Sequence, residues 1–272
     1  MEKFIKIIIM GLLAFVHSAC SFNSMFYYPD QENTEITNQD YTEDFLKLTN
    51  GEKIHYILAE AKNEELATIL VLHGNAGNLA GWSNVAEPLT NAGFKVYIID
   101  YRGFGKSDGK ASHKHLMEDA ITALNYVYKE NKDSGKPLMI LGFSIGGQLG
   151  IALAENNQDK IDLLVVEGTF TTHNDIATAI SPLLVKPFAR LLVASPYKAI
   201  QSIQKLNIPI GIIHSPDDGL IPFEMGQELF EAANEPKKFL QITGDHLAGL
   251  ELHKEEYISF LKTMVDESTK EH

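Results

Sequence analysis

Short apolar runs alternate with longer amphipathic segments through most of this chain, and this alternation limits its fold more than any other feature. Strands buried on both faces have this unbroken apolar character, because helices cover both sides of a parallel sheet. We therefore predict a mostly parallel, doubly wound α/β sheet that binds ligands at the carboxyl ends of its strands. The expected strands are residues 68–72, 96–100, 138–141, 161–166, 208–213 and 239–242, and the expected helices are residues 82–92, 115–131, 146–156, 224–233 and 254–266.

An antiparallel hairpin is expected before the parallel strands. Alternating apolar residues lie on both sides of Asn50-Gly51, and Asn-Gly between two such runs is a strong hairpin signal. The chain has 272 residues, 44% of them hydrophobic, and no break in composition divides its middle. We therefore expect a single folded domain over residues 43–272.

One connection between the expected strands is unusually long. About forty residues separate the strand at 161–166 from the strand at 208–213, and residues 176–194 are apolar at helical spacing. Long excursions in compact domains tend to be functional lids, so we predict a small helical cap at about residues 171–200. The alternative is an ordinary helix packed on the sheet.

The N-terminus has the three-part layout of a secretory signal peptide, which we assign to residues 1–19. Lys3 and Lys6 precede an apolar run over residues 7–16, shorter than the roughly twenty residues that span a bilayer. Ala19-Cys20 resembles the lipobox of bacterial lipoproteins, in which the cysteine is lipidated and begins the mature protein, although His17 departs from that pattern. We expect export and a lipid anchor on Cys20 in a bacterial cell membrane; an ordinary cleaved signal peptide or an uncleaved anchor are the alternatives.

Residues 20–42 form the expected tether between this anchor and the domain. They are rich in Asn, Gln, Asp, Glu and Thr, except for Phe-Tyr-Tyr-Pro at residues 26–29, which we expect to pack on the domain surface. The tether contains no candidate catalytic group, so a domain that starts near Gln31 is expected to keep its activity.

The candidate nucleophile is Ser144. An apolar strand runs into Gly-Phe-Ser-Ile-Gly, residues 142–146, and a helix follows at once. A sharp strand-to-helix turn of this kind exposes the serine hydroxyl, and only glycine fits on both sides of it. A serine hydroxyl is a poor nucleophile unless a base accepts its proton, so the pattern requires a histidine within reach.

An oxyanion hole is expected from two backbone N–H groups. One belongs to Ile145, which begins the helix behind the nucleophile, and the other to Asn75, in the loop at residues 73–78 after a buried strand. His73 begins this loop, and we interpret it as a bracing residue rather than as the catalytic base.

Three segments carry a family resemblance: residues 73–78 (His-Gly-Asn-Ala-Gly-Asn), residues 101–107 (Tyr-Arg-Gly-Phe-Gly-Lys-Ser) and residues 142–147. With Phe-Tyr-Tyr-Pro near the start, they resemble the α/β-hydrolase superfamily, and within it the Bem46-like branch of membrane-associated hydrolases, also called ABHD13/ABHD17-like. The resemblance implies the α/β-hydrolase fold and a triad in the chain order serine, acid, histidine.

The resemblance implies that His246, which follows the last strand on a glycine-containing loop, is the catalytic base. The family's His-Gly-x-x-Asp-x-x-Val-Pro loop implies Asp218 as the acid, here with Ser215 in place of the usual glycine. Asp217 and Glu167 remain alternatives for the acid, because Asp217 follows Pro216 at a position that suits a turn and some relatives carry the acid one strand earlier.

The formal net charge of −13 argues against a nucleic acid partner, since phosphate backbones require clustered basic residues. No His or carboxylate spacing predicts a metal site, and no cofactor is implied. We expect a serine hydrolase that acts on an ester or thioester of a small or lipid-like acyl group. An amidase or peptidase, an acyltransferase of the same fold, and a catalytically silent tethered binding protein are the alternatives.

Overall fold

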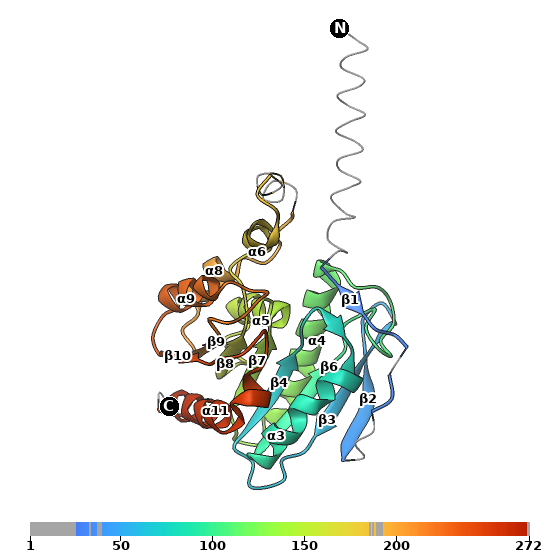
Figure 1. Cartoon of the computed structure of the whole chain (residues 1–272). Helices are drawn as coiled ribbons and strands as arrows, with labels where there is room; N and C mark the ends of the chain where they lie inside the picture. The colour runs from blue at the N-terminus through green and yellow to red at the C-terminus, as the bar shows by residue number, and fades with distance from the viewer. Residues whose placement is uncertain are drawn as a thin grey trace.

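The apolar runs form the interior of one eight-stranded sheet in the computed structural model, which describes residues 26–32, 34–36, 40–184, 186, 188 and 193–270. The strand order is β10-β9-β8-β7-β4-β6-β3-β2, parallel from β10 to β6 and antiparallel from β6 to β2 (Figure 1). The predicted mostly parallel α/β-hydrolase sheet with an N-terminal antiparallel hairpin is confirmed. The strands are β2 Tyr41–Lys47, β3 Lys53–Ala59, β4 Ala67–Leu72, β6 Phe94–Ile99, β7 Leu138–Phe143, β8 Leu163–Glu167, β9 Ile210–His214 and β10 Lys237–Gln241.

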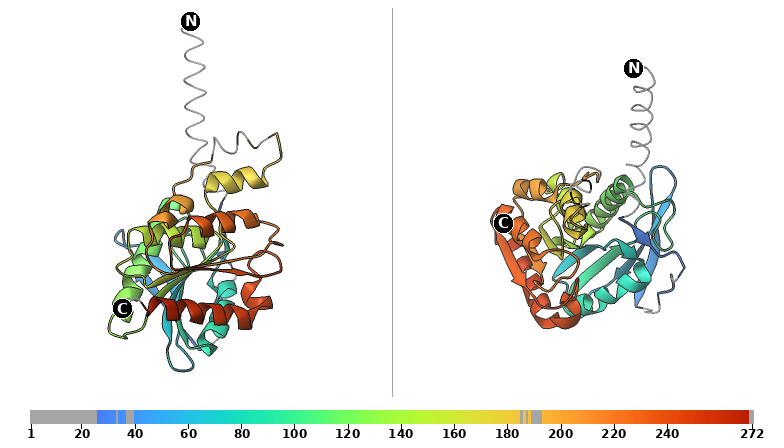
Figure 2. Two further views of the ribbon diagram at one scale, coloured as in Figure 1. Left: turned by 90° about the vertical axis from the view of Figure 1, so that its left-hand side faces the viewer. Right: turned by 45° about the horizontal axis from the view of Figure 1, so that its top comes forward.

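Helices cover both faces of the sheet, so the domain has two cores. One buried cluster contains residues of α4 (His113–Asn131), α5 (Ile145–Glu155) and α9 (Phe223–Ala232). The other contains residues of α3 (Ala86–Asn91) and α11 (Lys254–Ser268), which lie on the opposite face (Figures 1 and 2). The smaller helical elements are α2 Leu79–Trp82, η1 Ser83–Val85, α6 His173–Ile180, α8 Ala199–Ser202, η2 Ile203–Lys205 and α10 Gly249–Leu252.

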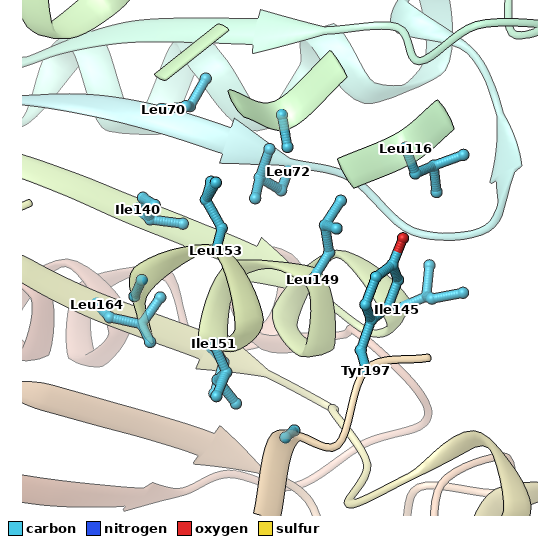
Figure 3. Close-up of a cluster of buried hydrophobic side chains, with 14 of the residues drawn as sticks. Leu70, Leu72, Leu116, Ile140, Ile145, Leu149, Ile151, Leu153, Leu164 and Tyr197 are labelled. Atoms are coloured by element: carbon cyan, nitrogen blue, oxygen red, sulfur yellow. The ribbon is translucent and has the colours of Figure 1, made fainter. Parts of the chain in front are cut away.

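Helix α5 is the helix that follows the candidate nucleophile, and it is packed into the core along its length. Leu149 and Leu153 of α5 are at most 1% exposed and belong to the same buried cluster as Leu72 and Ile140 of the sheet (Figure 3). Burying a leucine side chain contributes roughly 1.5–3 kcal/mol to stability. The turn that joins β7 to α5 is therefore held rigidly at both ends.

The expected helix at residues 82–92 is broken in the structure into α2, η1 and α3. Pro88 lies in the first turn of α3, where its missing N–H costs nothing, but the same residue could not continue a helix that began at Leu79. The other expected strands and helices occur within a few residues of their expected bounds.

The long connection after β8 leaves the body of the domain at its carboxyl edge. Helix α6 begins this connection with Thr172 as its N-cap, and Thr172 also pairs with Lys198 at the base of the excursion. Helix α6 projects from the rest of the domain (Figures 1 and 2). Leu183 and Leu184 beyond it are 80% and 88% exposed, so this part of the connection is not a helix packed on the sheet. Its role as a cap, with the bounds 171–200, stays a prediction.

The N-terminal end of the described chain packs on the domain, as expected for the aromatic residues within the tether. Tyr28 and Pro29 form β1, which pairs in parallel with β5 (Ala76–Gly77), and Tyr27 belongs to the larger core cluster. The expected tether thus includes a part that is docked on the folded domain. Residues 1–19 and Cys20 lie outside the described residues; within those that are described, no helix is long and apolar enough to cross a bilayer.

Candidate active site

Ser144 lies at a strained turn between β7 and α5. Its backbone has φ 54° and ψ −118°, a conformation that costs a non-glycine residue about 1–3 kcal/mol. The Ser144 N–H donates to the Glu167 carbonyl at 2.9 Å. The Ser144 carbonyl accepts from the N–H groups of Gly147 at 3.0 Å and Gln148 at 3.3 Å, and from Thr169 Oγ1 at 2.6 Å. The strain is thus balanced by bonds to the neighbouring strand and its loop.

The glycines on either side of Ser144 are required by contact. A Cβ on Gly146 would overlap the carbonyl oxygen of Leu72, and a Cβ on Gly142 would overlap the backbone of Gly147. The turn can therefore form only with glycine at both positions, as the Gly-x-Ser-x-Gly pattern predicts.

Among the backbone N–H groups near this turn that have no acceptor in the described part of the chain are two candidate oxyanion donors. They belong to Ile145, the first residue of α5, and to Asn75, in the loop between β4 and β5. Strand β4 lies next to β7 in the sheet, with Leu72 opposite Gly142, so both donors lie at the same edge. These are the two residues that the sequence predicts for the oxyanion hole.

His246 and Asp218 form a hydrogen-bonded pair at the ends of neighbouring strands. His246 Nδ1 lies 2.7 Å from Asp218 Oδ2, and the side chain of Asp218 is 2% exposed. Asp218 Oδ1 accepts from the N–H groups of Leu220 and Ile221, each at 2.8 Å, which fixes the plane of the carboxylate. The sequence-predicted acid and base are therefore in direct contact.

The imidazole of His246 lies over Gly168, the residue after β8. A Cβ on Gly168 would meet His246 Cε1 at 3.1 Å and Nδ1 at 3.2 Å, and Gly168 has φ +55°. The preceding residue, Glu167, accepts the hydrogen bond from the Ser144 N–H. A glycine at this position therefore gives the imidazole its space beside the turn at Ser144, a requirement that the sequence did not reveal.

The alternative acids do not contact the imidazole through a hydrogen bond. Asp217 Oδ2 lies 3.5 Å from the Gly244 N–H, and Glu167 Oε1 accepts from the Gly249 N–H at 3.0 Å. Burial raises the pKa of Glu167, which favours the neutral form over the carboxylate that a triad acid must be. The geometry favours Asp218.

The ionised form of Asp218 is strongly favoured. Burial alone would raise its pKa, but contacts with His214 and His246 hold it well below the ordinary value. His214 Nε2 lies 3.6 Å from Asp218 Oδ2, at the end of β9, a position to which the sequence analysis gave no role. Asp218 is therefore a carboxylate throughout the physiological pH range, suited to stabilising a protonated imidazole.

Comparisons with known proteins agree with this geometry. A family model described as serine aminopeptidase S33 (Hydrolase_4) matches residues 63–203. Protein bem46 of Schizosaccharomyces pombe is 30% identical over 244 residues, which cover 86% of this chain and 80% of that protein. The chain is a Bem46-like α/β-hydrolase.

Solved structures of low sequence identity share the fold of this Bem46-like hydrolase. The Pyrococcus furiosus esterase Pf2001 aligns with a TM-score of 0.70 at 18% identity, over 88% of this chain and 98% of that one. A soluble variant of the monoglyceride lipase from Saccharomyces cerevisiae aligns with a TM-score of 0.68 at 18% identity, over 90% of this chain and 99% of that one.

In this Bem46-like hydrolase, a buried polar cluster supports the loop that carries Asn75. His73 is fully buried, with Nε2 3.4 Å from Asp100 Oδ1, and its ring stacks on Trp82. The same Asp100 oxygen accepts from the Leu79 N–H at 3.0 Å, beyond the end of the loop. Asp100 thus holds both ends of the loop, and His73 braces it as the sequence predicted.

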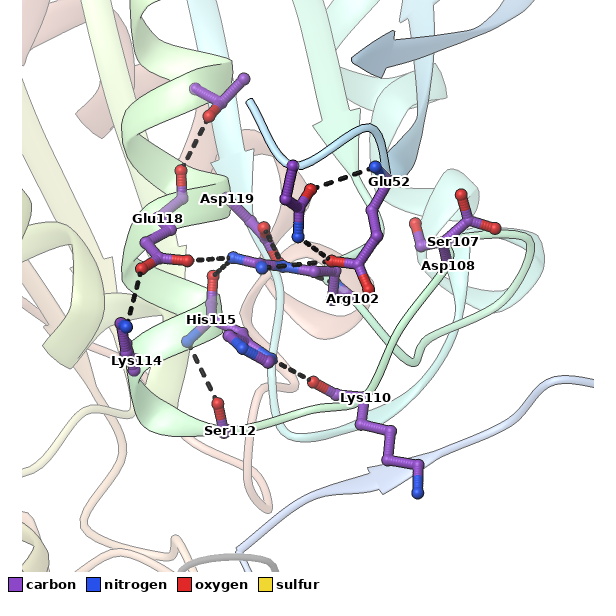
Figure 4. Close-up of polar contacts among 12 residues, drawn as sticks. Glu52, Arg102, Ser107, Asp108, Lys110, Ser112, Lys114, His115, Glu118 and Asp119 are labelled. Carbon is purple, nitrogen blue, oxygen red and sulfur yellow. Dashed lines mark hydrogen bonds and ion pairs between the residues drawn. The ribbon is translucent and has the colours of Figure 1, made fainter. Parts of the chain in front are cut away.

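Arg102 fastens the second family segment, residues 101–107, to helix α4. Its guanidinium donates to Asp119 at 2.7 Å and to Glu118 at 2.6 Å, and it lies 3.3 Å from Glu52 (Figure 4). Burial raises the pKa of Asp119 to about 6, although Arg102 acts in the opposite direction. These contacts give Arg102 a structural role in joining the segment to α4.

Proposed function

We propose that this protein is a serine hydrolase that cleaves an ester or a thioester through a covalent acyl-Ser144 intermediate. The observation that carries the proposal is the 2.7 Å contact between His246 Nδ1 and Asp218 Oδ2, beside the strained turn at Ser144. With its Nδ1 hydrogen bonded to a carboxylate, the imidazole keeps Nε2 as the base that a serine nucleophile requires.

In the acylation half of the reaction, His246 takes the proton of the Ser144 hydroxyl while Oγ attacks the carbonyl carbon of the substrate. The N–H groups of Ile145 and Asn75 stabilise the oxyanion that forms. The bond from the carbonyl carbon to the leaving oxygen or sulfur then breaks, and His246 donates its proton to the departing alcohol or thiol.

In the deacylation half, His246 takes a proton from water as the water oxygen attacks the acyl carbon. The ester bond to Ser144 breaks, its oxygen recovers the proton from His246, and the carboxylic acid departs. Asp218 stays ionised throughout and stabilises the imidazolium of each half. No cofactor or metal is needed for these steps.

An ester substrate is favoured by the two structural neighbours, one called an esterase and one a monoglyceride lipase. The family description, serine aminopeptidase, favours an amide as the second candidate. Acyl transfer to an alcohol would use the same intermediate with an alcohol in place of water. A catalytically silent binding protein is the alternative outside enzymes.

The test is a set of rates on p-nitrophenyl esters of graded acyl length, beside the p-nitroanilide of one of the same acids. We expect saturable turnover of the esters and at least about 100-fold lower kcat/KM on the anilide, which corresponds to roughly 3 kcal/mol. Faster turnover of the anilide would favour the peptidase alternative. An absence of turnover on every substrate would contradict the proposal.

We also propose that Cys20 carries a lipid that holds the enzyme on a bacterial membrane. The support is the basic start, short apolar run and Ala19-Cys20 of the sequence. Exposed apolar side chains at the carboxyl edge of the sheet, among them Leu183, Leu184 and Phe188, are consistent with a lipid-like acyl substrate.

A further inference from the structure

The first described residues form an N-terminal strap, residues 26–30, that lies along the oxyanion loop, residues 73–78. Within the strap, Tyr28 and Pro29 form β1, which pairs in parallel with Ala76 and Gly77 of β5 (Figure 1). This pair is separate from the eight-stranded sheet. The loop is therefore held by the strap on a side that the main sheet does not reach.

Two hydrogen bonds join the strap to Asn75, the candidate oxyanion donor. The Tyr28 N–H donates to the Asn75 carbonyl at 2.8 Å, and Asn75 Nδ2 donates to the Phe26 carbonyl at 3.0 Å. The Asn75 N–H has no acceptor among the described residues. The strap thus fixes the orientation of this residue and leaves its N–H available to a substrate oxygen.

The other end of the strap fastens the second half of the loop. The Asp30 N–H donates to the Gly77 carbonyl at 3.0 Å. The Asp30 carbonyl accepts from Asn78 Nδ2 at 3.1 Å and from the Gly105 N–H at 3.0 Å. Each of these bonds joins residues that are far apart in the chain, so the strap supports the loop in addition to the contacts from Asp100.

The strap is itself anchored in the core. Tyr27 is 5% exposed, and its hydroxyl lies 2.5 Å from Nδ1 of His113, the first residue of α4. The Phe26 ring meets the ring of His173, the first residue of α6, edge to face at 5.0 Å. With two aromatic side chains fixed in this way, the strap can resist displacement of the loop.

We propose that the N-terminal strap is a positioning element of the oxyanion hole, acting through the Tyr28 backbone on Asn75. The inference rests on the proposed acyl-serine mechanism, in which the Asn75 N–H stabilises the tetrahedral intermediate. Such an effect belongs to the transition state, so it changes kcat much more than KM. It also revises the expectation from the sequence that a domain starting near Gln31 keeps full activity.

The test is Tyr28→Pro in the full chain, with Tyr28→Ala as its matched control. Proline removes the N–H that bonds to Asn75, whereas alanine keeps that N–H and removes the same side chain, which is 62% exposed. The measurements are kcat and KM on a p-nitrophenyl ester, the thermal unfolding midpoint, and Ki for an alkyl boronic acid. The boronic acid forms a tetrahedral adduct with serine and so reports on the oxyanion hole.

We expect Tyr28→Pro to lower kcat roughly 10- to 100-fold, somewhat less than the complete loss of one oxyanion donor. KM should change by less than about threefold. Ki for the boronic acid should rise by a factor similar to the fall in kcat. The thermal midpoint should match that of Tyr28→Ala, which should have wild-type kcat.

A second variant, Asn75→Ala, keeps the backbone N–H and removes only the side-chain bond to the Phe26 carbonyl. Asn75→Ala should lower kcat by a smaller factor than Tyr28→Pro, with little change in KM. If Tyr28→Pro does not fold, the kcat of Asn75→Ala tests the role of the strap on its own. Wild-type kcat in the folded variants would overturn the inference, and so would an equal loss in Tyr28→Ala. A wild-type protein that hydrolyses no ester or amide would instead contradict the proposed function.

Discussion

The carboxylate of Asp218 accepts hydrogen bonds from two backbone N–H groups through one oxygen and contacts His246 through the other. Its neighbours therefore hold it in the position and charge state that a triad acid requires. The two other candidate acids lie in different environments from that of Asp218. Asp217 lies at an exposed turn, and Glu167 is buried with its pKa raised.

We predict that Asp218→Asn folds but loses roughly 10⁴ in kcat, because the amide neither stabilises the imidazolium nor fixes the correct tautomer of His246. Asp217→Asn and Glu167→Gln should each retain kcat within about tenfold, since neither side chain is hydrogen bonded to the imidazole. The three variants should be assayed side by side on one ester. Near wild-type kcat in Asp218→Asn with a collapse in either of the others would show that the acid is misassigned.

A second prediction at this scale concerns two buried histidines beneath the strap. Burial lowers the pKa of His113 to about 4 and that of His173 to about 3. In the unfolded chain these histidines have a pKa of about 6.5. At a pH between that value and their pKa in the folded protein, the unfolded chain binds more protons, so the free energy of unfolding falls as pH decreases through this range. Asp119, with its pKa raised to about 6, has the opposite dependence, so the comparison must be between variants.

Between pH 7.5 and pH 5, the free energy of unfolding of His173→Phe should fall by about 2 kcal/mol less than that of wild type, because phenylalanine has no proton to gain. Urea unfolding of wild type and His173→Phe at both pH values measures this difference. An identical pH dependence in the two proteins would mean that His173 is not held neutral in the fold.

Sequence patterns predicted some residues of the site and missed others, and the difference has a physical reason. Ser144 and its flanking glycines lie within one short turn, so their mutual requirement is visible in five consecutive residues. His214 lies only four residues before Asp218, but no sequence pattern marked its role, and the space above Gly168 is filled by an imidazole from a loop after a different strand. A contact between distant loops leaves no local spacing to read.

At the scale of the elements, strand and helix periodicity predicted the main sheet, because burial on both faces leaves a continuous apolar run. The two-residue pairing of β1 with β5 had no such signal, since its strands are too short for a period to appear. Pro88, in the first turn of α3, explains why the expected helix at 82–92 is broken, and proline's missing N–H makes that break a consequence of the sequence that the helical spacing alone did not show.

The exposed apolar residues beyond α6 carry a prediction about substrate preference. Leu184 and Phe188 are 88% and 62% exposed, so polar substitutions there should change the free energy of unfolding by less than about 0.5 kcal/mol. If this segment contacts the acyl chain, Leu184→Ser and Phe188→Ser should lower kcat/KM on long-chain esters by roughly tenfold and leave short-chain esters nearly unchanged. Equal losses on every ester together with unfolding would instead assign these residues to the core.

At the scale of the whole molecule, the strap and the predicted anchor are close in the chain. Residues 21–25 separate Cys20 from Phe26, so even fully extended chain allows only about 20 Å between them. A lipid on Cys20 would therefore hold the carboxyl edge of the sheet, with its exposed apolar residues, near the membrane surface.

We predict that Cys20 begins the mature protein and carries the lipid, so Cys20→Ser should stall processing or release most of the protein from membranes. Fractionation and intact mass of the purified protein test this, with Ser18→Ala as a control that leaves the cysteine in place. A mature N-terminus elsewhere, without added lipid, would refute the lipoprotein assignment. The hydrolase activity of the domain would be unaffected by that result.

The central claim is that Ser144 is the nucleophile that becomes acylated, and a fluorophosphonate probe tests it most directly. The account predicts one covalent adduct, located by peptide mass mapping on Ser144 and formed at a rate that depends on His246. Ser144→Ala should keep the wild-type thermal midpoint, take up no probe and hydrolyse no ester above background. Undiminished labelling or turnover in Ser144→Ala would contradict the account.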